Sequence, residues 1–183
     1  MQINSPNGTY VGVTERNEIK TSTTSQTADR NQNELGGGVW SFSFSGVNPA
    51  GANDYFAHIL NTNGADYVIT DFRLWATTAT GNVIIHKVSG DPTFTGSTTI
   101  SGLGRNTKFA ATPDIVFKTD TDITGLTDGG TYFTLPLDTV GELRSLKTTS
   151  GIILGPNGAI ALEWTGATGE ISGTISIAKV ATR

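Results

Sequence analysis

Large apolar and small polar residues alternate sharply in the segment VWSFSFSG, residues 39–46. Trp40, Phe42 and Phe44 fall on one face of an extended chain, and serines fall on the other. Successive side chains of a β-strand point to opposite faces. The pattern therefore predicts a strand whose aromatic face is buried.

The same two-residue period recurs along the chain, with Gly, Asn, Asp and Pro between the runs. It predicts an all-β protein of about eight antiparallel strands and no helix. Two facing sheets, a β-sandwich or jelly roll, suit this pattern. Besides the first run, the expected strands are residues 55–61, 67–76, 83–88, 132–137, 152–154, 160–164 and 170–180, with shorter runs at 99–101 and 115–119.

Four segments carry more detailed expectations. Val68, Thr70, Phe72 and Leu74 are expected on one face of their strand. The GPNG turn, residues 155–158, is expected to let the strands on either side of it pair with each other. Leu103 to Gly130 is expected to be a long connection, with a short edge strand at 115–119 and a turn in DITGLTDGG. Pro136 predicts an edge strand or a bulge.

The first 38 residues show no sustained apolar period. Ordering one residue costs roughly 1–2 kcal/mol of backbone entropy, so this segment does not hold a shape alone. We predict an N-terminal arm at residues 1–38 and a sandwich domain at 39–183, with Gly36, Gly37 and Gly38 as the hinge.

Two interpretations of the arm compete. One is a disordered tail or linker. The other, which we favour, is an arm that becomes ordered by lying over a neighbouring subunit, to which it adds a strand. The residues expected to contact that partner are Tyr10, Val11, Val13 and Ile19.

Composition narrows the classes of function. The net charge is −4 and basic residues form no cluster, so we expect no nucleic-acid partner. No apolar run is long enough to span a membrane. The chain contains no cysteine, which excludes disulfides and thiol catalysis. The first ten residues do not resemble a signal peptide.

Candidate catalytic and metal-binding residues are few. His58 and His86 each lie in an apolar run without a nearby acid at ligand spacing, so we expect both to be structural. Trp40, Trp75 and Trp164 are expected in the core, although exposed aromatic rings could stack on sugars. No catalytic signature occurs, so we expect neither an enzyme nor a cofactor.

An acidic segment offers one alternative. Asp120, Asp122 and Asp128 supply the hard oxygen ligands that calcium prefers. The spacing does not match an EF-hand, because Thr124 and Thr131 stand where ligands are required. An acidic turn is the favoured interpretation, and a loose calcium site in a loop remains the alternative.

Several segments in order carry a resemblance to a known group of proteins. They are the arm GTYVGVTERNEIKT, the Gly joint, an aromatic strand, and then NVIIHKVSGDPTFTG, GLGRNTK and GIILGPNGAIALEWTG. This layout resembles the head decoration, or cement, proteins of tailed bacteriophages. It covers nearly the whole chain, and its two motifs are TERNEIK and ILGPNGAIALEW.

The resemblance implies a jelly roll that forms a homotrimer on the capsid surface, made in the host cytoplasm. It implies binding to the major capsid protein, with the arm over neighbouring subunits, and no catalytic residues. A carbohydrate- or receptor-binding module of a tail spike or fibre, with a host-surface glycan as partner, is the alternative. A hydrolase whose site the sequence conceals is the third and weakest.

Overall fold

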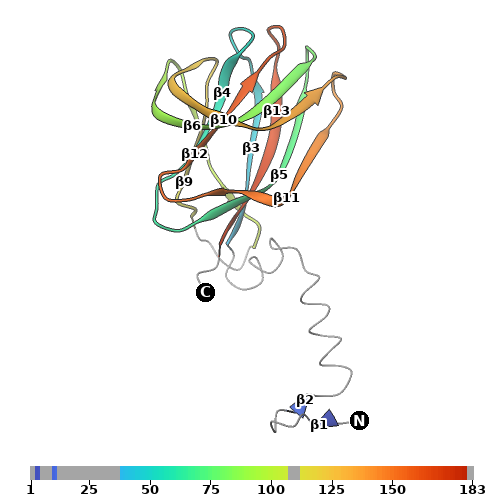
Figure 1. Cartoon of the computed structure of the whole chain (residues 1–183). Helices are drawn as coiled ribbons and strands as arrows, with labels where there is room; N and C mark the ends of the chain where they lie inside the picture. The colour runs from blue at the N-terminus through green and yellow to red at the C-terminus, as the bar shows by residue number, and fades with distance from the viewer. Residues whose placement is uncertain (1–2, 5–9, 12–37, 107–111, 181–183) are drawn as a thin grey trace.

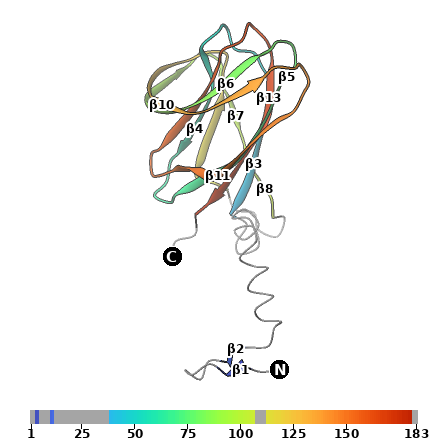
Figure 2. The ribbon, with the colours of Figure 1, turned by 45° about the vertical axis from the view of Figure 1, so that its right-hand side comes forward.

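The computed structural model describes residues 3–4, 10–11, 38–106 and 112–180. They form an all-β structure without helices, in which two antiparallel sheets pack face to face (Figures 1 and 2). The predicted β-sandwich is confirmed.

One sheet has six strands and the other has five. The six-stranded sheet has the order β10-β6-β12-β4-β9-β7, and the five-stranded sheet has the order β11-β5-β13-β3-β8. The strands are β3 (Val39–Val47), β4 (Asp54–Asn61), β5 (Tyr67–Ala76), β6 (Gly81–Phe94), β7 (Thr98–Ile100), β8 (Leu103–Gly104), β9 (Ile115–Thr119), β10 (Ile123–Leu137), β11 (Arg144–Leu154), β12 (Ala159–Trp164) and β13 (Ile171–Lys179).

The eight long strands follow a jelly-roll connection. From β3 to β6, and again from β10 to β13, each strand lies in the opposite sheet from the one before it. The central orders β10-β6-β12-β4 and β11-β5-β13-β3 are those of a jelly roll. The short strands β7, β8 and β9 are inserted between β6 and β10 and extend the sheets on the β3 and β4 side.

Aromatic side chains join the two sheets in the core. The ring centroids of Phe42 and Phe117 lie 5.8 Å apart, as do those of Phe44 and Phe117. The Phe44 ring also lies 6.2 Å from that of Phe56. Burying each such ring contributes about 1.5–3 kcal/mol. The aromatic face predicted for β3 is thus confirmed.

The predicted face of β5 is wrong in its first half. Tyr67 and Ile69 are buried there, while Val68 and Thr70 are only half-buried. The register against β13 shifts at this point: Asp71 pairs with Ser176, and the next pair is Ile69 with Ile177. The resulting bulge exchanges the two faces of the strand, an effect that a strict two-residue period does not anticipate.

The expectation that the strands flanking GPNG pair with each other is also wrong. β11 pairs with β5, whereas β12 pairs with β4 and β6 in the opposite sheet. The GPNG connection crosses from one sheet to the other, and hydrogen bonds to the end of β4 hold it in place. Asn157 N–H donates to the Asn61 carbonyl (3.1 Å), and Asn61 N–H donates to the Gly158 carbonyl (3.0 Å).

The region from Leu103 to Gly130 is more regular than expected. Residues 115–119 form β9 as expected, but the predicted edge position is wrong, because β9 lies between β4 and β7. The predicted turn in DITGLTDGG is also wrong, because this segment belongs largely to β10. Gly90 and Gly125 have φ of +96° and +76°, and a Cβ on Gly90 would lie 2.7 Å from the Gly125 carbonyl oxygen. These glycines therefore permit the irregular pairing that extends β6 and β10. Pro136 lies in β10, an edge strand, as predicted.

Candidate functional site

The predicted arm contains a short hairpin. β1 (Ile3–Asn4) pairs with β2 (Tyr10–Val11), so that Ile3 is opposite Val11 and Asn4 is opposite Tyr10. The two strands form a sheet of their own. Two of the predicted contact residues thus lie in this hairpin.

The other arm residues are only partly described. Val13, Ile19, Gly36 and Gly37 lie outside the described residues. Gly38, the last residue of the predicted hinge, accepts a 2.8 Å hydrogen bond at its carbonyl from Lys179 N–H. The start of the sandwich is therefore tied to the end of β13.

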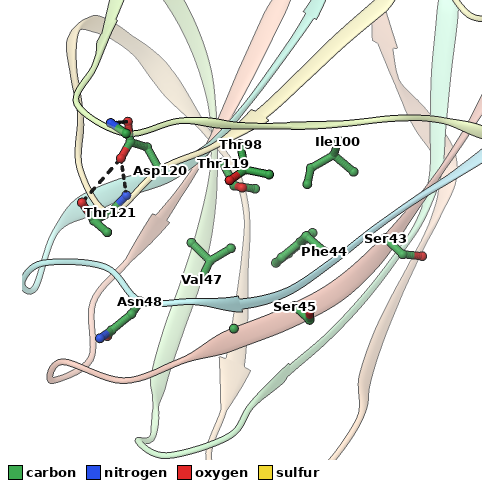
Figure 3. A pocket seen from close by; sticks show the side chains of 12 residues that line it. Ser43, Phe44, Ser45, Val47, Asn48, Thr98, Ile100, Thr119, Asp120 and Thr121 are labelled. Atoms are coloured by element: carbon green, nitrogen blue, oxygen red, sulfur yellow. Dashed lines mark hydrogen bonds between the residues drawn. The ribbon is translucent and has the colours of Figure 1, made fainter.

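A groove opens between β3 and β7 (Figure 3). Its volume is about 380 Å³. β8 pairs with β3 only at Trp40 and Ser41, and the groove begins beyond that pairing. It is lined by Ser43, Phe44, Ser45, Gly46, Val47, Asn48, Gly96, Thr98, Ile100, Thr119, Asp120 and Thr121.

Apolar side chains form the inner part of this groove. Phe44 is buried, and Val47 and Ile100 are partly buried against the core (Figure 3). Most other lining side chains are short hydroxyl, amide or glycine residues. A groove with an apolar floor and small polar walls, beside a strand edge, suits an extended peptide.

The Asp120 carboxylate in this groove is already engaged. It accepts hydrogen bonds from the N–H groups of Gly96 (3.1 Å), Thr121 (2.7 Å) and Thr95 (2.8 Å). Burial acts to raise the pKa of this carboxyl, but these hydrogen bonds outweigh it and hold the pKa below its usual range. Asp120 thus fixes the turn after β6.

A second polar cluster lies on the outer side of the six-stranded sheet. His86 in β6 is buried, and its Nδ1 lies 3.1 Å from Asp128 Oδ1 in β10. Its Nε2 lies 2.7 Å from Glu163 Oε2 in β12, at ion-pair distance but not aligned as a hydrogen bond. The Tyr55 ring packs edge-on against the imidazole at 5.6 Å. Burial, followed by the charges of Asp128 and Glu163, raises the pKa of Tyr55.

His58 lies in a different environment on β4. Its ring packs edge-on against Phe94 at 6.3 Å, and Lys118 Nζ lies 4.7 Å from the centre of the Phe94 ring. Burial, assisted by the Lys118 charge, lowers the pKa of His58 from 6.5 to about 4. This imidazole is therefore neutral at physiological pH.

Sequence reasoning placed both histidines in strands but missed the acids around His86. Asp128 and Glu163 are distant from His86 in the sequence and reach it only because β10 and β12 flank β6. No local spacing reveals such neighbours. Both ring nitrogens of His86 face carboxylates, so the cluster is arranged to join three strands.

The acidic residues weighed as calcium ligands do not converge. Asp128 accepts from Gly130 N–H at 2.7 Å in addition to facing His86, and Asp120 is held by the turn after β6. Among the described residues, no group of three His, Asp or Glu side chains could hold a metal ion. Trp40 and Trp164 are buried as predicted, whereas Trp75 is half-buried.

Comparison with known proteins returns no relatives: no family model, no curated protein and no solved structure matches the chain. In the part of the chain that the structure describes, no helix has the length and apolar character to span a membrane.

Proposed function

We propose that this protein is a non-enzymatic structural protein of a bacteriophage virion that decorates and stabilises the head. In this proposal it is made in the host cytoplasm and binds the major capsid protein on the capsid surface as a homotrimer. Its N-terminal arm lies over neighbouring subunits.

The observation that carries the proposal is the separation of the arm hairpin from the sandwich. β1 and β2 pair with each other, while the core assembled from β3 onward contains the large buried side chains. A sandwich that is complete without its first strands leaves those strands available to another molecule. The resemblance of the arm and of ILGPNGAIALEW to head decoration proteins supplies the identity of that molecule.

The physical advantage of such an arrangement is repeated attachment. An arm that engages a second subunit raises the effective concentration of the domain at the surface, so it slows dissociation without a larger core. Repeated over a symmetric shell, these contacts resist outward pressure.

Co-purification with heads tests the proposal. The full chain should sediment with expanded heads built from the major capsid protein of the same phage. Deletion of residues 1–35, and separately Val11→Asp in β2, should reduce the bound amount at least tenfold. Thr134→Asp, at an exposed position of β10, is the matched control and should bind normally. Undiminished binding of both arm variants would contradict the arm's role.

A second candidate rests on two exposed rings. Tyr132 and Phe133 are adjacent in the edge strand β10, with exposed fractions of 41% and 38%. Exposed aromatic rings can stack on sugars, so a carbohydrate- or receptor-binding module of a tail spike or fibre is the alternative. It would be favoured by glycan-array binding that Tyr132→Ala and Phe133→Ala abolish and Thr134→Ala does not.

A further inference from the structure

We propose that the groove between β3 and β7 accepts an added β-strand, and that the donor is the β1–β2 hairpin of a second copy of this chain. This inference deepens the proposed function, because it names the place where the arm lies on a sister protomer. The biological role that it gives to the arm depends on the proposed function.

The main chain of β3 is paired differently on its two edges. One edge pairs with β13, with a register shift after Phe44, whereas on the other edge, among the described residues, strand pairing is limited to Trp40 and Ser41 with β8. The Val39 carbonyl accepts from Arg105 N–H on the β8 side. Alternate residues of a strand direct their N–H and C=O groups to the same edge. Ser43, in the regular part of β3, therefore presents main-chain groups to the groove.

The two sheets differ in extent on this side of the sandwich. On this side the six-stranded sheet continues through β9 to β7, whereas the five-stranded sheet ends in the two-residue strand β8. β7 thus lies across from a position that no described strand occupies next to the second half of β3. A strand added there would extend the smaller sheet opposite β7.

Apolar side chains lie beneath the position of the added strand. Phe44 is buried beneath this position, while Val47 and Ile100 are only partly covered. An added strand would place alternate side chains over Val47 and Ile100, and the others toward solvent. The small lining residues, among them Gly46 and Gly96, leave room for a backbone to approach.

The N-terminal arm contains a segment suited to be the donor strand. The segment GTYVGV, residues 8–13, is rich in β-branched and aromatic residues, which favour strands. In the described part of the chain, β2 pairs with β1 on one side only. Residues 12–37 join the hairpin to the sandwich, and 26 residues span at most about 90 Å. That limit far exceeds the radius of gyration of about 15 Å expected for a domain of this size, so a second copy is within reach.

The absence of cysteine makes cross-linking a direct test. Val11→Cys and Tyr10→Cys are made in one full-length chain, each as a single variant, and Ser45→Cys in a second, size-tagged full-length chain. The chains are mixed and mildly oxidised. Disulfide-linked heterodimers should form with at least one of the two donor positions. Ser89→Cys, exposed on β6, is the matched acceptor control and should yield at least fivefold less.

A competition experiment and an intrachain control distinguish the possible results of the cross-linking. A synthetic peptide of residues 1–14 in excess should lower the heterodimer yield severalfold. Heterodimer no more abundant than with Ser89→Cys, for both donor positions, would overturn the proposal. So would preferential closure within one chain in a double variant carrying Val11→Cys and Ser45→Cys. If cross-linking fails while head binding still requires the arm, the proposed function survives and only this acceptor groove is refuted.

Discussion

The imidazole Nε2 of His86 lies 2.7 Å from Oε2 of Glu163, and this contact joins β6 to β12. The other ring nitrogen faces Asp128 in β10. The carboxylates of Glu163 and Asp128 thus lie on opposite sides of the imidazole. The cluster therefore connects three neighbouring strands on the outer side of the sheet.

Neutralising one partner of this cluster should weaken the fold. We expect Glu163→Gln to lower the free energy of unfolding by about 1–3 kcal/mol at neutral pH, since it removes the charge beside a buried imidazole. Glu142→Gln is the matched control: Glu142 lies 3.3 Å from Arg144, and the exposed fractions of the two side chains, 45% and 37%, are well above the 14% of Glu163. Glu142→Gln should lower the free energy of unfolding by less than about 1 kcal/mol. Chemical denaturation measures both, and equal losses would contradict the structural role of the cluster.

His58 should make the fold sensitive to mild acid. Its pKa is about 4 in the folded protein against an ordinary 6.5, so between these values the unfolded chain binds a proton that the folded chain does not. Stability should therefore fall as the pH drops from 6.5 to about 4, by up to about 3 kcal/mol. In His58→Phe this part of the pH dependence should disappear. Urea denaturation across that range measures the difference, and parallel curves for the two proteins would refute it.

Asn61 should be among the least replaceable polar residues. Its buried side-chain amide donates to the carbonyls of Ala65 (2.7 Å), Leu154 (3.0 Å) and Gly155 (2.9 Å). Asn61→Ala leaves these buried acceptors without their donor, and we expect a loss of about 2–4 kcal/mol. Asn63→Ala, at a neighbouring exposed position, should cost less than about 1 kcal/mol. Thermal and urea denaturation compare the two; a similar cost for both would argue against the anchoring of GPNG by β4.

Replacing each of two neighbouring aspartates with asparagine should change the free energy of unfolding in opposite directions. Hydrogen bonds outweigh burial and lower the pKa of Asp120, whereas burial followed by the charges of Asp54 and Asp120 raises the pKa of Asp122. At neutral pH, Asp120→Asn should destabilise the fold by about 1–3 kcal/mol. Asp122→Asn should leave stability unchanged or raise it by a few tenths of a kcal/mol.

The pH dependence distinguishes these two carboxylates. Because the folded-state pKa of Asp120 is lowered, its stabilising effect is present above the ordinary value of 3.8 and is lost as the pH falls below it. Protonation of Asp122 removes the cost of burying its charge and then the repulsion from Asp54 and Asp120, so its effect has the opposite sign. Acid denaturation of both variants measures this, and changes of the same sign would contradict the assignment.

The sandwich should fold without the arm. Among the residues whose burial the structure describes, the core is built from β3 onward, and β1 pairs with β2 rather than with either sandwich sheet. Deletion of residues 1–35 should therefore change the free energy of unfolding by less than about 1 kcal/mol. Denaturation of the shortened chain measures this, and a loss of several kcal/mol would show that the arm stabilises its own domain.

The sequence by itself determined the fold class and most of the core. The alternation in residues 39–45 and the apolar run ending at Trp164 identify buried strands, because the face of a side chain follows from its position in an extended backbone. Turn residues between the runs located most strand ends. These are local properties, so a local pattern suffices to find them.

The tertiary structure alone decided which strands became neighbours. GPNG joins opposite sheets because Asn61 holds it, and the faces of β5 exchange where Asp71 meets Ser176. The acids beside His86 and the groove between β3 and β7 likewise depend on strand order. Hydrogen bonds and packing between residues far apart in the chain set that order, and the two-residue period carries no information about them.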